Sequence, residues 1–147
     1  MNPYSVVAIL WSVSTNRAIT GGPYIGTAEP WNGPKILAVS RKTDHADLGL
    51  PGGKVEPGET PEAALIREVF EETSLRLTNL QVVFEHLDRV EGAERRPCRC
   101  FSATWEGEAV SMEGARVEWV LPKDLVTPAC SFAEYNRRLF AALGVTP

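Results

Sequence analysis

The stretch LPGGKVEPGETPEAALIREVFEETSL at residues 50–75 places a double glycine before a segment that is crowded with glutamate. Its second half predicts a helix over residues 60–73. Thr60 is a favoured N-cap, and Pro61 suits the first helical position, where the N–H that proline lacks has no partner within the helix. This helix is the clearest element in the sequence, and the other elements are placed around it.

Three glutamates gather on one side of the predicted helix. At 100° per residue, Glu68, Glu71 and Glu72 fall within one arc of about 100°. The opposite side is apolar, and we expect it to pack on a sheet. It carries Ala63, Ile66 and Phe70. Like charges three and four residues apart repel each other, so a positive partner is expected beside the acidic face.

Two interpretations fit the acidic face. The first is an ordinary solvated face, as most runs of charge are. The second is a site for Mg²⁺ or Mn²⁺, which are hard cations that prefer several oxygen ligands. The glycines favour the second interpretation, because Gly52 and Gly53 let the backbone come close with a carbonyl free to bind a cation. Lys54 follows them and can contact a phosphate.

Composition and charge limit the classes of partner. The chain has 147 residues and a net charge of -4, so we expect one domain over residues 1–147 and no binding of duplex nucleic acid, which rests on a basic surface. No apolar run approaches the ~20 residues that cross a bilayer, and residues 1–10 lack the pattern of a signal peptide. A cytoplasmic protein without membrane contact is therefore expected. Cys98, Cys100 and Cys130 predict reduced thiols rather than a disulfide framework.

Strands and one further helix are predicted around the acidic helix. Apolar, β-branched runs predict the strands, which are expected at residues 5–14, 35–40, 80–87, 99–105 and 116–121. Residues 131–143 predict a closing helix that stops at Gly144. Residues 15–34 and most of 44–57 are predicted to be loop, and residues 94–96 an exposed turn. Strands interleaved with two helices predict an α/β fold with a mixed sheet between helices.

The acidic helix and its flanks match a longer motif. The pattern is glycine, five residues, glutamate, seven residues, Arg-Glu, two residues, then Glu-Glu. In this chain it is carried by Gly53, Glu59, Arg67, Glu68, Glu71 and Glu72. The motif resembles the signature of the Nudix hydrolases. The later glycine of that signature is Ser74 here, just past the helix, where a left-handed conformation is common and a serine costs about 1 kcal/mol.

The resemblance implies a Nudix fold, which is an α/β/α sandwich with a central mixed sheet. It also implies hydrolysis of a diphosphate bond in a small nucleotide substrate, with Mg²⁺ or Mn²⁺ as cofactor. The metal ligands that it implies are the carbonyl of Gly52 and the carboxylates of Glu68, Glu71 and Glu72. Arg67 and Glu59 are implied to orient those carboxylates. Monomer and homodimer both stay open.

The resemblance to the MutT-like branch of the family extends, more weakly, beyond the motif. Glu113 matches a loop glutamate that acts as a further metal ligand or as a general base. Glu118 is a second candidate, and a solvated loop glutamate is the alternative. Phe132 and Asn136 match a pair in which the asparagine reads a purine edge, since an amide both donates and accepts. The alternative places Phe132 in the core and Asn136 on a helix surface.

Arg41 and Lys42 match a basic pair that meets phosphates, with an exposed strand end as the alternative. The predicted function is therefore a pyrophosphohydrolase of a nucleoside triphosphate that releases a monophosphate and pyrophosphate. An oxidised purine nucleotide such as 8-oxo-dGTP is the sharpest expectation. One alternative is an ADP-ribose or nucleotide-sugar pyrophosphatase, some of which carry proline where this chain has Glu91. A second alternative is a non-catalytic module that binds nucleotides.

Overall fold

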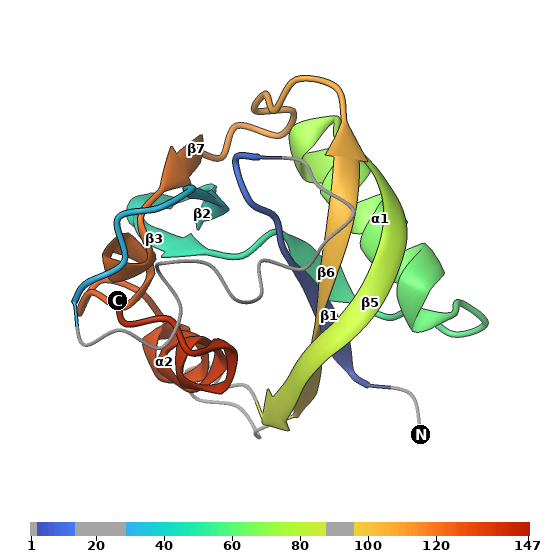
Figure 1. The fold of residues 1–147 in the computed structure, drawn as a ribbon. Helices are drawn as coiled ribbons and strands as arrows, with labels where there is room; N and C mark the ends of the chain where they lie inside the picture. Colours follow the sequence, from blue (N-terminus) through green and yellow to red (C-terminus); the bar gives the residue numbers. More distant parts are fainter. Residues whose placement is uncertain (1–2, 14–28, 88–95) are drawn as a thin grey trace.

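The computed structural model describes residues 3–13, 29–87 and 96–147, and Figure 1 shows how their elements are arranged. The strands are β1 (Ser5–Ile9), β2 (Ile36–Arg41), β3 (Asp44–Gly49), β4 (Gly52–Lys54), β5 (Arg76–Leu87), β6 (Pro97–Glu106) and β7 (Val117–Val120). The helices are α1 (Pro61–Thr73), the short 3₁₀ helix η1 (Pro122–Leu125) and α2 (Ala133–Leu143).

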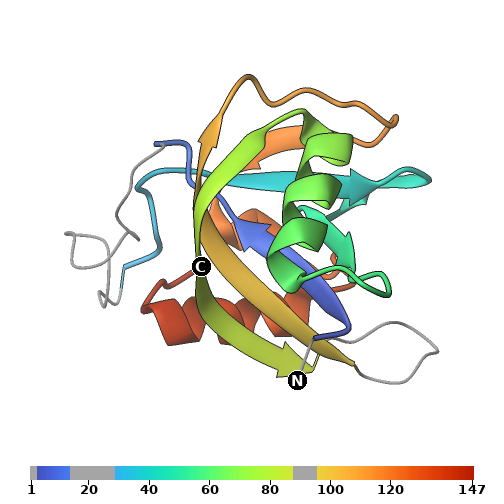
Figure 2. The same cartoon turned by 90° about the vertical axis from the view of Figure 1, so that its right-hand side faces the viewer.

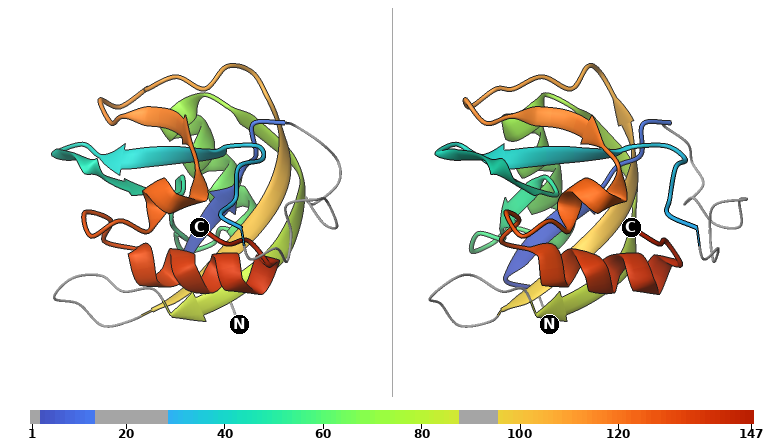
Figure 3. Two further views of the ribbon diagram at one scale, coloured as in Figure 1. Left: turned by 60° about the vertical axis from the view of Figure 1, so that its left-hand side comes forward. Right: turned by 90° about the vertical axis from the view of Figure 1, so that its left-hand side faces the viewer.

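The strands form two sheets, in the orders β4-β1-β6-β5 and β3-β2-β7. β1 runs parallel to β6 and antiparallel to β4, which makes the larger sheet mixed. The two long helices lie on opposite sides of the strands: Figure 2 looks onto α1, and Figure 3 looks onto α2. The predicted α/β architecture is confirmed, with the strands divided between two sheets.

β1 and the residues after it separate two apolar layers, because alternate side chains of an extended chain point to opposite faces. Val6, Ala8 and Leu10 pack in the layer beneath α1. Ile9 and Trp11 pack in the layer beneath α2. Burial on both faces explains why this part of the sequence is almost continuously apolar.

The start of α1 is confirmed, but its predicted packing face is wrong. Thr60 caps the helix, and its Oγ1 accepts a 3.1 Å hydrogen bond from the backbone of Ala63. Ile66 and Phe70 are 40% and 42% exposed, and Ala63 is exposed as well. The helix instead buries Pro61, Ala64, Leu65, Val69 and Thr73. This rotation puts the stripe that carries Glu68 and Glu72 at the border of the buried face.

Two strands lie where mainly loop was predicted. β3 forms an antiparallel hairpin with β2, and β4 pairs with β1 through the register Val6 to Gly53. The first three residues of β3 are exposed, and β4 is mostly glycine, so neither has the apolar alternation that marks a strand. Backbone pairing alone defines β4. It also fixes the double glycine directly against the central strand.

Other boundaries shift by a few residues. The first strand ends at Ile9, and Trp11 makes only an isolated bridge to Ile36. β5 begins at Arg76 rather than near residue 80, and its irregular register includes Asn79 at a φ of 54°. The closing helix ends at Gly144 as predicted. Most of the predicted 15–34 loop lies outside the described residues, as do residues 94 and 95 of the predicted turn.

The cysteine prediction is confirmed, since Cys98, Cys100 and Cys130 are free and buried. Burial raises the pKa of the Cys100 thiol well above its ordinary value, so this thiol stays protonated. Across the described ranges, none of the helices combines the length and the apolar character that a bilayer crossing needs.

Candidate active site

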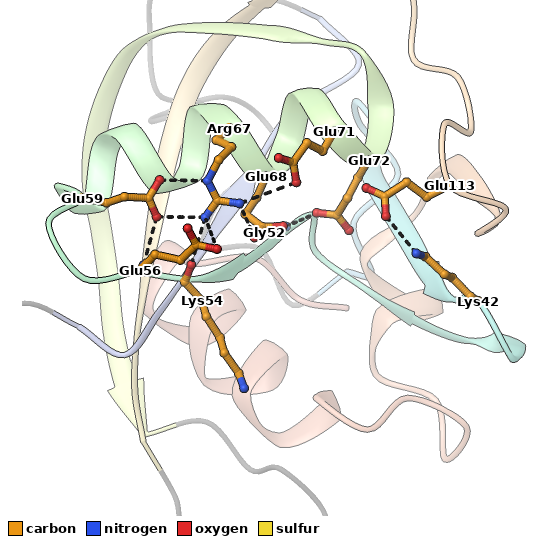
Figure 4. A network of polar contacts seen from close by, with 10 residues as sticks. All are labelled: Lys42, Gly52, Lys54, Glu56, Glu59, Arg67, Glu68, Glu71, Glu72 and Glu113. Atoms are coloured by element: carbon orange, nitrogen blue, oxygen red, sulfur yellow. Dashed lines mark hydrogen bonds and ion pairs between the residues drawn. The ribbon is translucent and has the colours of Figure 1, made fainter.

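Arg67 is the centre of a polar network on α1, as Figure 4 shows. Its Nε and Nη2 donate to the two carboxylate oxygens of Glu59 at 2.8 and 2.9 Å. Its Nη1 donates to Glu68 Oε1 at 2.9 Å and lies 3.5 Å from Glu71 Oε2. A planar guanidinium is suited to such paired contacts. Arg67 therefore has the position that a residue orienting these carboxylates needs.

The ion pair between Arg67 and Glu59 keeps both groups charged. Hydrogen bonding from Arg67 lowers the pKa of Glu59 to about 2, and the backbone N–H of Glu56 adds to this effect. The same pairing with Glu59 raises the pKa of Arg67 above its ordinary value. The pair joins the loop before α1 to the middle of the helix.

At both positions of the double glycine, another group occupies the space that a side chain would need. A Cβ on Gly53 would lie 2.4 Å from Cδ of Glu68, and a Cβ on Gly52 would lie 2.0 Å from the backbone oxygen of Val6. Backbone therefore blocks a side chain at Gly52, and a side chain at Gly53 would have to displace the Glu68 carboxylate. In addition, the backbone N–H of Gly52 donates to Glu72 Oε1 at 2.9 Å. β4 is thereby fastened to the acidic face of α1.

The charged form of Glu72 is strongly disfavoured in the site. Burial raises its pKa to about 8, although the hydrogen bond from Gly52 lowers it, and the negative charges of Glu68, Glu113 and Glu71 raise it further. Burial likewise raises the pKa of Glu68. Several carboxylates thus share a partly desolvated region, which is a setting that a cation would relieve.

The donor set fits a hard divalent cation, which prefers carboxylate and carbonyl oxygen. The candidate ligands are the carbonyl of Gly52 and the carboxylates of Glu68, Glu71, Glu72 and Glu113. We call this group of residues the acidic site. As the side chains lie, no three His, Cys, Asp or Glu residues in the described part of the chain are gathered closely enough to hold one ion. Glu68 and Glu71 contact Arg67 instead. A cation would therefore compete with Arg67 for these two carboxylates.

Glu113 reaches the site from the segment between β6 and β7. Its Oε2 pairs with Lys42 Nζ at 2.9 Å, and Figure 4 shows it on the side of Glu72 that is remote from Arg67. Glu118, the second candidate, lies on β7 and pairs with Arg116, the residue before that strand. The structure therefore brings Glu113, rather than Glu118, to the other carboxylates.

Arg41 and Lys42 have different partners in the structure, and their contact with phosphates stays a prediction. Arg41 Nε pairs at 2.8 Å with Asp47, which is buried. The same carboxylate accepts a 2.8 Å hydrogen bond from the backbone N–H of Ser131. Arg41 thus ties β2 and β3 to the residues that precede α2, and only Lys42 lies beside the acidic site.

A cavity of about 210 Å³ opens beside the double glycine. Its lining includes Tyr4, Leu50, Gly52, Phe132, Tyr135 and Asn136. The predicted pair Phe132 and Asn136 therefore shares one cavity that borders the acidic site. Tyr4 and Tyr135 were missed by sequence reasoning, because an aromatic residue near a strand or on a helix face is usually core.

Asn136 is 1% exposed, so the alternative that placed it on a helix surface is wrong. Its Nδ2 donates to the backbone oxygen of Leu125 at 2.9 Å, and none of the described residues donates to its Oδ1. Lys54 also lines the cavity, with Nζ 5.5 Å from the centre of the Tyr4 ring. In Figure 4 the Lys54 side chain points away from the carboxylates, so its phosphate contact stays a prediction.

Comparison with known proteins identifies the family. The family model of the NUDIX domain matches residues 25–143. The chain belongs to the Nudix family. A solved structure, that of the MutT NUDIX hydrolase from Burkholderia pseudomallei, superposes with a TM-score of 0.65 at 21% identity, covering 97% of this chain and 98% of that one. The predicted Nudix fold is confirmed.

Two curated relatives of this Nudix chain differ in the substrate that they are named for. The 8-oxo-dGTP diphosphatase of Escherichia coli (strain K12) is 40% identical over 75 residues, which are 50% of this chain and 57% of that protein. The ADP-ribose pyrophosphatase of Methanocaldococcus jannaschii is 44% identical over 59 residues, which are 37% of this chain and 35% of that protein. The chain thus spans little more than half the length of the first relative and about a third of the second.

Proposed function

We propose that this Nudix chain is a metal-dependent pyrophosphohydrolase of nucleoside triphosphates. It would cleave between the α and β phosphates and release a nucleoside monophosphate and pyrophosphate. The observation that carries the proposal is the position of Gly52. Its N–H is bonded to Glu72 of the acidic site at 2.9 Å, and the same residue lines the apolar cavity. A nucleotide whose base enters the cavity therefore has its phosphates beside the carboxylates.

Each charged residue of the site has a task in this proposal. Gly52, Glu68, Glu71, Glu72 and Glu113 would hold Mg²⁺ or Mn²⁺, which when bound neutralises phosphate oxygens and lowers the pKa of a bound water. Arg67, fixed by Glu59, orients Glu68 and Glu71. Lys42 supplies positive charge at the far end of the acidic site.

Glu113 is the proposed general base. It is the carboxylate of the acidic site that comes from a separate segment rather than from α1, so it approaches from another direction. A base on that segment takes a proton from the attacking water while the helix carboxylates keep their positions. The water oxygen then forms the new bond to phosphorus as the bond to the bridging oxygen breaks.

The base is proposed to be an oxidised purine such as that of 8-oxo-dGTP. Phe132 and Tyr135 supply apolar and aromatic walls. The bond from the Nδ2 of Asn136 to Leu125 fixes the orientation of the amide, and its Oδ1 is proposed to accept from an N–H donor on the base edge. Oxidation at purine C8 creates an N–H donor at N7. An acceptor fixed in a buried wall discriminates strongly against a base that lacks the matching donor.

ADP-ribose is the second candidate substrate. The similarity of 59 residues to an ADP-ribose pyrophosphatase favours it, and the acidic site would serve it equally well. It differs in the products, because cleavage of its diphosphate gives AMP and ribose phosphate rather than pyrophosphate.

A substrate panel tests the proposal. Purified protein is incubated with Mg²⁺ or Mn²⁺ and, separately, with 8-oxo-dGTP, the ordinary triphosphates, ADP-ribose, nucleotide sugars and diadenosine polyphosphates, and the products are resolved. The highest kcat/KM for 8-oxo-dGTP, with pyrophosphate released, is the expected result. Preference for ADP-ribose would move the assignment to the second candidate. Tight nucleotide binding without turnover would instead identify a non-catalytic module.

A further inference from the structure

Ser74 occupies the position at which the family signature has glycine. It ends α1 in the left-handed region, at a φ of 64°, and its backbone N–H donates to the carbonyl of Phe70 at 2.9 Å. Glycine adopts this conformation without strain, whereas serine does not. A strained residue at such a place is informative when its side chain makes a contact that glycine cannot make.

The Ser74 side chain makes such a contact. Its Oγ donates at 3.0 Å to the backbone oxygen of Glu108, which belongs to the segment of residues 107–116 between β6 and β7. We call this segment the acidic-site loop. Two backbone bonds continue the attachment: Val110 N–H donates to Thr73 at 3.0 Å, and Met112 N–H donates to Glu72 at 3.3 Å.

This row of three bonds ends at the acidic site. Met112 bonds to the backbone of Glu72, and the next residue is Glu113, whose charge raises the pKa of Glu72. Bringing a fourth carboxylate beside three others is unfavourable without a cation. Lys42 offsets part of the repulsion, at 2.9 Å from Glu113. The remainder must be resisted by the attachment of the acidic-site loop to α1.

We propose that Ser74 is a positioning residue that acts through Glu113. Its hydroxyl anchors the acidic-site loop to the end of α1, so that Glu113 stays beside Glu72 before substrate and cation bind. The hydrogen bond of the hydroxyl offsets the strain of the left-handed serine and leaves the site preformed. This inference rests on the proposed function of Glu113, while the attachment of the loop can be measured independently of activity.

Two substitutions separate the hydroxyl from the strain. Ser74→Gly removes both the hydroxyl and the strain, so its melting temperature should stay close to that of the wild type. Ser74→Ala removes the hydroxyl and keeps the strain, so it should melt lower. A matched control is Ser12→Ala, since the Ser12 hydroxyl also makes one hydrogen bond, accepting from Lys35 N–H at 2.9 Å, and neither residue belongs to the acidic-site loop.

Amide hydrogen exchange in metal-free protein measures directly how firmly the acidic-site loop is bonded to α1. In both Ser74 variants the N–H groups of Val110 and Met112 should exchange about three- to tenfold faster than in wild type, as expected for loss of one hydrogen bond. The Ser12→Ala control should leave both rates unchanged. Unchanged exchange at Val110 and Met112 in Ser74→Gly would overturn the proposal, whatever the enzyme turns over.

A double-mutant cycle then tests the route through Glu113. In the wild-type background, Ser74→Gly should lower kcat about three- to tenfold with little change in KM. In a Glu113→Gln background it should cause no further loss. Equal losses in both backgrounds would show that Ser74 acts on stability or on another group, and would overturn the proposal. If the wild type turns over no nucleotide, the proposed function fails while the exchange result still stands.

Discussion

The carboxylate of Glu68 lies where a side chain on Gly53 would have to be: a Cβ at that position would come within 2.4 Å of Glu68 Cδ. The glycine of β4 and the glutamate of α1, fifteen positions apart in the sequence, thus form one contact between the strand and the helix. This contact gives a physical reason for the fixed spacing between the double glycine and the acidic helix. It also identifies the substitutions that should disturb the site without removing a charge.

Gly53→Ala should lower activity more than stability. The new methyl group must displace the Glu68 carboxylate, which is the end of a flexible side chain, so the cost in stability stays below the ~1–3 kcal/mol of overpacking in a rigid core. Because a carboxylate of the site moves, kcat should fall about a hundredfold. The control is Gly58→Ala, where a Cβ meets nothing within 4 Å although φ is 84°. That variant should lose stability and keep its kcat. Thermal melts measure the stability of both variants and rate assays measure their kcat, and equal kcat losses would contradict the account.

Arg67→Lys should keep the charge and still impair the site. Lysine cannot hold both oxygens of Glu59 while it also contacts Glu68, because it lacks the planar fork of donors. Loss of an orienting residue of this kind typically lowers activity about 10- to 100-fold, and steady-state kinetics measure it. Arg138→Lys is the matched surface control, since Arg138 forms a 3.5 Å pair with Glu134 on α2. Full activity in Arg67→Lys would show that paired contacts are not needed.

Stability at acid pH should depend on Glu59. Its ordinary pKa is 4.5, and hydrogen bonding to Arg67 lowers the pKa to about 2 in the folded protein. The stabilisation is therefore present above pH 4.5 and is lost as the pH falls through about 2. Urea unfolding of wild type and Glu59→Gln should show a gap in stability at pH 6 that closes progressively towards pH 2. A gap that stays constant with pH would contradict the assignment.

Asn136→Ala should reduce discrimination between bases rather than turnover itself. The ratio of kcat/KM for 8-oxo-dGTP over dGTP should fall about tenfold or more, because the buried acceptor is removed. Since the carbonyl of Leu125 also loses its partner, a thermal melt must accompany the kinetics. Asn32→Ala, at an exposed position, is the control. An unchanged ratio in a folded Asn136→Ala protein would assign base recognition elsewhere in the cavity.

The acidic helix could be predicted from the sequence because its signals are local. A cap at Thr60, proline in the first turn and glutamates at helical spacing all act within a few residues. The rotation of the helix could not be predicted. Ile66 and Phe70 are as apolar as Leu65 and Val69, and the shape of the layer beneath α1 decides which stripe is buried.

The other features that the sequence could not predict depend on interactions across the fold. β4 is defined by backbone pairing with β1, which leaves no side-chain pattern to read. Arg41 and Lys42 are neighbours in sequence, yet one pairs with Asp47 and the other with Glu113. The role of Ser74 depends on a bond to Glu108, which no local pattern signals.

The most direct test of the account compares pyrophosphate release from 8-oxo-dGTP by wild type, Glu71→Gln and Glu72→Gln, each with Mg²⁺ and with excess chelator. Wild type should release pyrophosphate only with Mg²⁺. Both variants should fold, and Glu72→Gln should melt no lower than wild type because a neutral amide replaces a half-buried carboxylate. Both should be slower by about a thousandfold or more. Wild-type rates in both folded variants would contradict the assignment of the acidic face as the metal-dependent catalytic site.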